Sequence, residues 1–161
     1  YKEEGAGKLL LLGDILYHGP RNDLPKDYAP KKVIEILNGM KEELLCIRGN
    51  CDCEVDQMVL KFPILADYAA FWLGDLMVWA THGHVYNMNN LPPFKKGDIL
   101  LHGHTHIPAA QSFGDGYYYI NPGSLSIPKE GSKNSYMILE GRTFTLKSVE
   151  DGSVISSFTV E

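Results

Sequence analysis

The sequence lacks several features that would place it in a common class of protein. It has three cysteines, Cys46, Cys51 and Cys53, whose odd number and close spacing do not suit a disulfide framework. No apolar run approaches the ~20 residues that cross a bilayer, and no signal peptide is visible. We therefore expect a cytoplasmic protein in a reducing compartment, with no membrane partner.

Clustered positive charge is scarce as well. The chain carries 15 Lys and Arg against 20 Asp and Glu, which gives a formal net charge of -5. Binding to duplex nucleic acid depends on clustered Lys and Arg that contact phosphates, so we expect no duplex nucleic acid partner. An acidic chain can still bind a phosphate ester when bound cations supply the positive charge.

The length and the apolar pattern indicate one domain over 1–161 with an α/β beginning and a β meander at the end. With 161 residues and 44% apolar residues, the chain is long enough for a real core. Continuous apolar runs at 8–12 and 44–47 suit strands buried on both faces, and Pro30 suits the first position of a helix. The expected elements are helices over 30–43 and 54–61 and strands at 8–12, 44–47, 76–80, 99–101, 117–120, 135–139, 142–149 and 154–160.

Each early strand ends beside a glycine and a side chain that can bind metal. The ends are Gly13-Asp14, Gly49-Asn50, His82-Gly83-His84 and the segment from His102 to His106. Ligands of open α/β sheets bind beyond the carboxyl ends of the strands, where such side chains converge. Alone, a Gly-Asp or Gly-Asn pair is usually a turn, but three histidines within five residues have little structural use.

The predicted ligands are a carboxylate, an amide oxygen and imidazoles. This mixed set suits Mn, Fe, Zn, Ni or Mg and argues against a thiolate site. His104 and His106 are two residues apart, so on an extended chain their side chains point the same way and can serve one metal or two adjacent metals.

With these motifs assembled, the chain resembles the calcineurin-like metallophosphoesterase superfamily. Within it, the segments GDILYHGPRN, RGNCDCEVDQM, THGH, GHTHIP and INPGSLSIPK resemble the YfcE-type phosphodiesterases. The resemblance implies an α/β fold, a two-sheet α/β/β/α sandwich, with a site for two divalent metal ions. Mn²⁺ is the ion that we expect.

The resemblance also implies roles for individual residues. Asp14 would bridge both ions, Asn50, His82 and His104 would complete one ion, and His106 would bind the other. A water that bridges the two ions would then attack phosphorus in line, and the metals would neutralise the charge on the phosphoryl oxygens.

The chain departs from the family pattern in two places. No Asp-x-His motif precedes Gly13, and the chain starts at Tyr1, so we expect a copy that lacks its first strand and most of its first helix. Cys51 stands where many relatives have a histidine that protonates the leaving group, and a thiol matches that role less well near neutral pH.

Several nearby residues have both a functional and a structural interpretation. His18, Arg21 and Asn22 lie in a loop that could contact substrate, or could simply face solvent. Asp52 could orient Asn50 in the catalytic site, or cap the following helix, which is the simpler explanation. His84 is a turn residue or a supporting residue of the site, and His102 suits the core at a strand end.

The leading function is a metal-dependent phosphodiesterase that acts on a small phosphodiester. The alternatives are a non-catalytic interaction scaffold, a use of this fold that a retromer subunit illustrates, and a phosphomonoesterase. The resemblance also favours a homo-oligomer.

Overall fold

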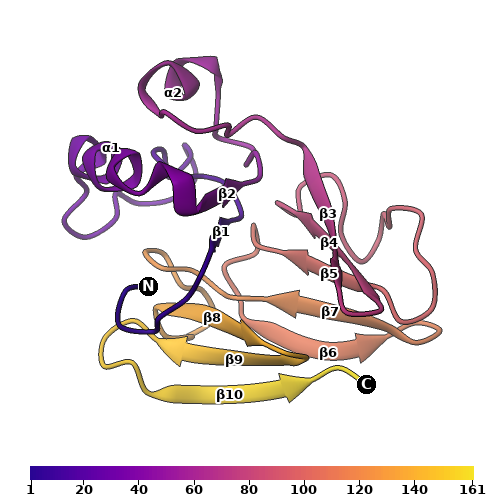
Figure 1. Cartoon of the computed structure of the whole chain (residues 1–161). Helices are drawn as coiled ribbons and strands as arrows, with labels where there is room; N and C mark the ends of the chain where they lie inside the picture. The colour runs from indigo at the N-terminus through magenta and orange to yellow at the C-terminus, as the bar shows by residue number, and fades with distance from the viewer. The chain divides into compact units, whose positions relative to one another are not determined.

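The computed structural model describes all residues, Tyr1–Glu161, as a mixed α/β fold (Figure 1). Its helices are α1 (Pro30–Gly39), the 3-10 helix η1 (Lys41–Glu43) and α2 (Glu54–Val59). Its strands are β1 (Leu9–Leu11), β2 (Leu44–Cys46), β3 (Tyr68–Leu73), β4 (Leu76–Thr81), β5 (Ile99–His102), β6 (Ala109–Phe113), β7 (Tyr117–Asn121), β8 (Ser135–Glu140), β9 (Thr143–Ser148) and β10 (Val154–Thr159). No helix has the length and apolar character that a membrane span requires.

Backbone contacts divide the chain into two compact units. Unit 1 is Tyr1–Tyr68, and unit 2 is Ala69–Glu161. Unit 1 contains the two α-helices and the strands β1 and β2, whereas unit 2 contains nearly all of the β-structure. That the two units form a single domain over 1–161 stays a prediction.

Unit 1 is a small parallel sheet packed against α1. β1 pairs with β2 in register, with Leu9 opposite Leu44. Val33 of α1 packs on the same core, which includes Leu37 and Ile64. The expectation of a helix over 30–43 is wrong at its end: α1 stops at Gly39, the Met40 N–H donates to the Leu37 carbonyl at 3.1 Å, and a 3-10 turn follows. The tighter turn ends the α-helical pattern.

The prediction that the first two strands are buried on both faces is also wrong. All three residues of β1 are half-buried, and Leu45 in the middle of β2 is 50% exposed. The reason is the size of the sheet in unit 1, which has only these two strands. A two-stranded sheet offers few neighbours to cover its faces.

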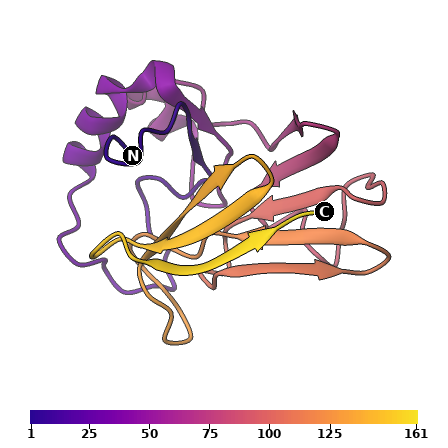
Figure 2. The ribbon, with the colours of Figure 1, turned by 60° about the horizontal axis from the view of Figure 1, so that its bottom comes forward.

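Unit 2 contains a five-stranded and a three-stranded sheet. The larger sheet has the order β3-β4-β5-β7-β6, in which β4, β5 and β7 are parallel and β6 is antiparallel to β7. The smaller sheet is the antiparallel meander β8-β9-β10 that the sequence predicts (Figure 2). The Tyr118 ring of β7 lies 6.1 Å from the Phe158 ring of β10, so the two sheets face each other.

Two strands of unit 2, β3 and β6, are absent from the sequence-based prediction. Both are edge strands of the five-stranded sheet. The sequence of β6, AAQSF, has a weak apolar pattern, whereas that of β3, YAAFWL, is apolar throughout and shows no alternation. By contrast β5, at the centre, is buried at every position, as its continuous apolar run predicts. Because β4, β5 and β7 are parallel, their carboxyl ends lie at one edge of the sheet, the edge that carries the predicted histidines.

Candidate metal centre and active site

In unit 1 the chain segments that follow β1 and β2 touch each other through two glycines. A Cβ placed on Gly13 would collide with the Gly49 backbone, and one placed on Gly49 would collide with the Asp14 carboxylate. Gly13 also has a φ of 93°, a conformation that favours glycine. The Gly-Asp and Gly-Asn pairs are therefore required for a close approach of two backbones.

This crossing brings Asp14 against the segment that carries Asn50 and Cys51. The Asp14 carboxylate accepts a hydrogen bond from the Cys51 N–H at 2.9 Å, and Asp14 itself has a φ of 55°. An aspartate tolerates this left-handed conformation better than most residues. The Asn50 amide nitrogen lies 3.2 Å from the Cys51 sulfur, and the carbonyl oxygen at the other end of this amide is a hard donor of the kind that divalent cations accept.

Asp52 has a role other than the predicted helix cap. Its side chain is 3% exposed and accepts three backbone hydrogen bonds, from Asp14 at 2.8 Å, Ile15 at 2.9 Å and Gly49 at 2.7 Å. The cap of α2 is Cys53, in a capping box with Asp56. Asp52 therefore holds the two crossing turns together and fixes the position of Asp14.

The three cysteines form no disulfide, and two of them have pKa values that favour the thiol form. Burial, followed by the negative charge of Asp14, raises the pKa of Cys51 to about 11. Burial raises the pKa of Cys46 to about 12. Cys51 thus stays a neutral thiol near neutral pH, which suits a weak proton donor and not a thiolate ligand.

The loop between β1 and α1, residues 12–29, contains the three predicted substrate contacts. The His18 ring packs between Tyr17 and Tyr28, with ring centroids 4.9 and 5.4 Å away. The Asn22 amide donates to the His18 carbonyl at 2.6 Å, so its donor is used within the loop. Arg21 is exposed. The predicted contact of these residues with substrate stays a prediction, and the structure gives His18 and Asn22 roles in loop packing.

In unit 2 the ends of β4 and β5 bring two histidines into contact. His82 Nε2 lies 3.1 Å from His104 Nδ1. Gly83 makes this approach possible, because a Cβ at this position would lie 2.5 Å from His102 Nδ1 and 3.1 Å from the His104 Cβ. The Gly103 N–H also donates to the His82 carbonyl at 3.0 Å, which fixes the two turns in register.

The separation of these nitrogens fits a metal site. Two nitrogens bound to one cation at about 2.1 Å each lie roughly 3 Å from one another when the angle at the metal is near 90°. His82 is buried and His104 half-buried, and two imidazole nitrogens that face each other at this distance need a proton or a cation between them. The donor set of unit 2 therefore fits a divalent metal ion.

The prediction that His104 and His106 lie on extended chain is wrong. β5 ends at His102, and His104 and His106 have φ values of 63° and 62°. The two side chains consequently leave a turn and not a strand. His106 Nδ1 lies 2.8 Å from the Ile127 carbonyl, so this nitrogen carries the proton and Nε2 is the nitrogen that can bind metal.

A residue that sequence reasoning did not single out orients this turn. The Asn121 side chain, which is fully buried, donates to the Gly103 carbonyl at 2.9 Å and to Thr105 Oγ1 at 3.0 Å, and accepts the Gly123 N–H at 2.9 Å. The available signal was an asparagine before Pro122 at the end of a parallel strand.

The remaining histidines of unit 2 have different environments. His102 is 3% exposed, stacks on Tyr119 and lies 3.0 Å from the Gly103 carbonyl, which agrees with a core role. Burial lowers the pKa of His102 and so favours the neutral form of the ring. His84 is exposed, with its ring 5.3 Å from that of His82.

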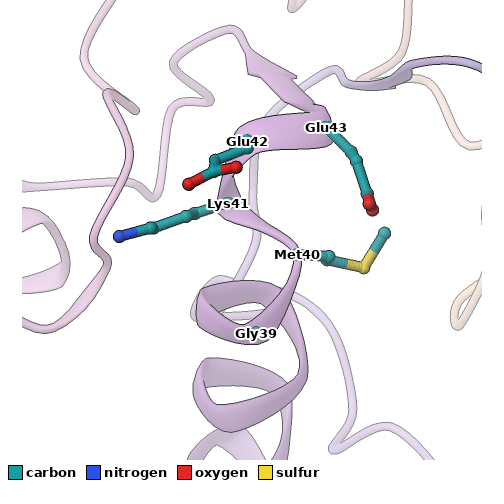
Figure 3. A pocket seen from close by; sticks show the side chains of 5 residues that line it. All are labelled: Gly39, Met40, Lys41, Glu42 and Glu43. Carbon is teal, nitrogen blue, oxygen red and sulfur yellow. The ribbon is translucent and has the colours of Figure 1, made fainter.

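One pocket of unit 1 lies away from these residues, at the end of α1. It is lined by Gly39, Met40, Lys41, Glu42 and Glu43. Lys41 and Glu42 point to one side of the backbone, whereas Met40 and Glu43 point to the other (Figure 3). Side chains that diverge in this way do not form a metal or substrate site.

Comparisons with known proteins identify the family. A model described as the calcineurin-like phosphoesterase superfamily domain matches residues 2–143. The chain belongs to this superfamily of hydrolases, which act on phosphoric ester bonds. Membership implies divalent metal ions, and the mixed carboxylate, amide and imidazole donors of this chain fit them.

Individual relatives and solved structures show how similar the chain is to known proteins. Phosphodiesterase YfcE of Escherichia coli (strain K12) is 43% identical over 160 residues, which cover 99% of this chain and 86% of that protein. A solved structure of E. coli YfcE, described as a phosphoesterase, has a TM-score of 0.94 and covers 99% of this chain and 87% of that one. A Vps29 variant from Entamoeba histolytica has a TM-score of 0.57 at 20% identity, covering 94% of this chain and 98% of that one, and shares the fold alone.

Proposed function

We propose that the protein is a metal-dependent phosphodiesterase. The observation that carries the proposal is the pair of imidazole nitrogens of His82 and His104, 3.1 Å apart at the ends of two parallel strands. The 43% identity to Phosphodiesterase YfcE supports a diester as substrate. The proposed metal ligands are Asp14, Asn50, His82, His104 and His106.

The residues of the chain have separate tasks in this proposal. The Asp14 carboxylate must remain ionised and aimed, and the Asp52 carboxylate holds its backbone while Cys51 donates an N–H to it. His106 presents Nε2 because Ile127 binds its Nδ1. These supporting contacts reduce the reorganisation that the site needs during the reaction.

We further propose two divalent ions, with Mn²⁺ as the physiological metal. The ligands named above would hold the cations, which would supply positive charge for the phosphoryl oxygens and would acidify the attacking water, so that the proposed nucleophile is a metal-bridging hydroxide. An acidic chain with net charge -5 has few cations of its own for a phosphodiester, which supports this division of labour.

Cys51 occupies the position of the leaving-group acid in this proposal. Its thiol is neutral over the neutral pH range because its pKa is about 11. A thiol with so high a pKa transfers a proton poorly, so the enzyme should depend on leaving groups that depart without much protonation. We propose a cytoplasmic location on the number and spacing of the cysteines in the sequence, and a homo-oligomer on the family resemblance.

Hydrolysis of bis(4-nitrophenyl) phosphate with added Mn²⁺ tests the function. We expect Asp14→Asn to lower kcat/KM about 100-fold or more, because an amide cannot supply the negative charge of a shared ligand. Asp23→Asn, an exposed carboxylate of the same loop, is the matched control and should retain activity. The Mn²⁺ affinity of both variants, measured by calorimetry, separates loss of metal from loss of chemistry.

A phosphomonoester, 4-nitrophenyl phosphate, completes the test. Faster turnover of the monoester than of the diester would favour the phosphomonoesterase alternative. A folded chain that binds Mn²⁺ but hydrolyses neither ester would contradict the enzyme assignment and favour the scaffold.

A further inference from the structure

The three arginines of the chain differ in what they contact. Arg142 forms an ion pair with Asp75, and Arg48 donates to the Asp52 carbonyl at 3.3 Å and lies 4.0 Å from Glu54. Both therefore brace the fold. Arg21 forms neither a hydrogen bond nor an ion pair with a carboxylate. Its positive charge partly offsets the rise that burial and Asp14 cause in the pKa of Cys51.

The loop that carries Arg21 is packed against Cys51. A Cβ at Gly19 would lie 3.2 Å from the Cys51 sulfur, so the loop backbone is in contact with this thiol. Gly19 has a φ of 81° and is buried, which lets the chain pass close to the sulfur and then return to the surface at Arg21.

The same loop is held in one shape by its own contacts. The Tyr28 hydroxyl donates to the Leu16 carbonyl at 2.6 Å, and Asn22 donates to the His18 carbonyl at 2.6 Å. The His18 ring packs between two tyrosines, and its Nδ1 is buried with no hydrogen-bond partner. A buried polar atom without a hydrogen bond costs free energy, so packing against the two tyrosines must hold the His18 ring in this position. These contacts therefore fix the loop backbone on which Arg21 lies.

From this arrangement we infer that Arg21 is a specificity residue on the leaving-group side of the site, and that it binds a negative charge carried by the leaving alcohol. The inference rests on the proposed function, in which Cys51 occupies the leaving-group position. It names the substrate class as phosphodiesters whose leaving alcohol bears a further anionic group, such as a phosphate or a carboxylate. A guanidinium suits both groups because its N–H donors match two oxygens at once.

Two aryl diesters with closely similar leaving groups test the inference. The neutral probe is methyl 4-nitrophenyl phosphate, and the charged probe is methyl 3-carboxy-4-nitrophenyl phosphate, both with saturating Mn²⁺. We expect Arg21→Gln to lower kcat/KM about tenfold for the charged probe and less than twofold for the neutral one, the size of a charge-assisted contact. For the charged probe, Arg21→Lys should have a kcat/KM between those of Arg21→Gln and the parent. Lysine keeps the positive charge but loses the paired N–H donors of the guanidinium.

Lys26→Gln provides the matched control, because Lys26 is an exposed cation of the same loop. It should change the ratio of the two kcat/KM values by less than twofold. The free energy of unfolding of Arg21→Gln should equal that of the parent, since Arg21 makes no contact that braces the fold. Equal loss on both probes, or no change in their ratio, would overturn the inference while leaving the proposed function in place.

Hydrolysis of neither probe by the parent chain would instead contradict the proposed function. Binding then decides the inference without turnover. The Nε–Hε NMR signal of Arg21 should shift on adding 5-hydroxy-2-nitrobenzoate, the freed charged leaving group, and should not shift with 4-nitrophenol. An Arg21 signal that ignores both compounds refutes the inference.

Discussion

The two units hold their predicted ligands by different means. In unit 1 the backbones of Gly13 and Gly49 touch, and a buried carboxylate, Asp52, binds three N–H groups of the crossing turns. In unit 2 the histidines extend from turns that are held by a side-chain amide, Asn121, and by the Ile127 carbonyl. In unit 1 the backbone contacts that position the ligand also hold the fold together. In unit 2 the ligands are oriented by hydrogen bonds from neighbouring residues. Changes in unit 1 should therefore cost stability, and changes in unit 2 should mainly cost metal affinity.

The largest effect is expected at Gly49. Gly49→Ala would force a methyl group into the Asp14 carboxylate and backbone, so we expect a loss of about 4 kcal/mol or more in the free energy of unfolding. Urea denaturation measures this loss. Gly39→Ala is the control, because no atom lies within 4 Å of the added methyl, and it should be neutral or stabilising. A Gly49→Ala chain as stable as the parent would contradict the crossing.

A smaller but still large effect is expected at Asp52. Asp52→Asn keeps the shape, removes the charge from three hydrogen bonds and turns an NH₂ group toward a backbone donor. We expect a loss of about 3 kcal/mol, together with weaker Mn²⁺ binding, because the Asp14 turn loses its support. The exposed Asp67→Asn serves as control. If Asp52→Asn left the unfolding midpoint unchanged, Asp52 would not hold the turns.

The smallest effect on stability is expected at Asn121. Asn121→Ala removes the donor to the Gly103 carbonyl and should cost about 2 kcal/mol. Its main consequence should be a Mn²⁺ affinity about tenfold lower, as is usual when a group that orients a metal ligand is lost. Calorimetric titration with Mn²⁺ checks this, with the exposed Asn89→Ala as control. A stability loss with unchanged affinity would remove the distinction between the two units.

The Gly-Asp dipeptide occurs at several places in the chain, and its role at each place cannot be predicted from the neighbouring residues alone. Gly13-Asp14 places a predicted ligand at the end of β1, whereas Gly74-Asp75 forms the turn between β3 and β4. The dipeptide is the same, and only the surrounding fold decides its role. Two edge strands also escaped the prediction. β6 has a weak apolar pattern, and the apolar run of β3 lacks the alternation that its exposed and half-buried positions show in the fold.

Local patterns were sufficient for much of the molecule. The apolar runs of β4, β5 and β7, the helix start at Pro30 and the meander of β8–β10 follow from periodicity and turn chemistry, which act over a few residues. The order of candidate ligands at strand ends also follows from the sequence, and it was enough to indicate the family that the comparisons establish.

What the sequence determined by itself is therefore the type of each ligand and the strand that it follows. Tertiary structure alone decided that Asp52 holds turns 37 and 38 residues away, that Asn121 supports the histidine turn, and that His104 and His106 leave a turn instead of a strand. The physical reason is the separation along the chain over which each effect acts. Propensity and periodicity are local, whereas buried hydrogen bonds take whichever partner the folded chain brings within reach.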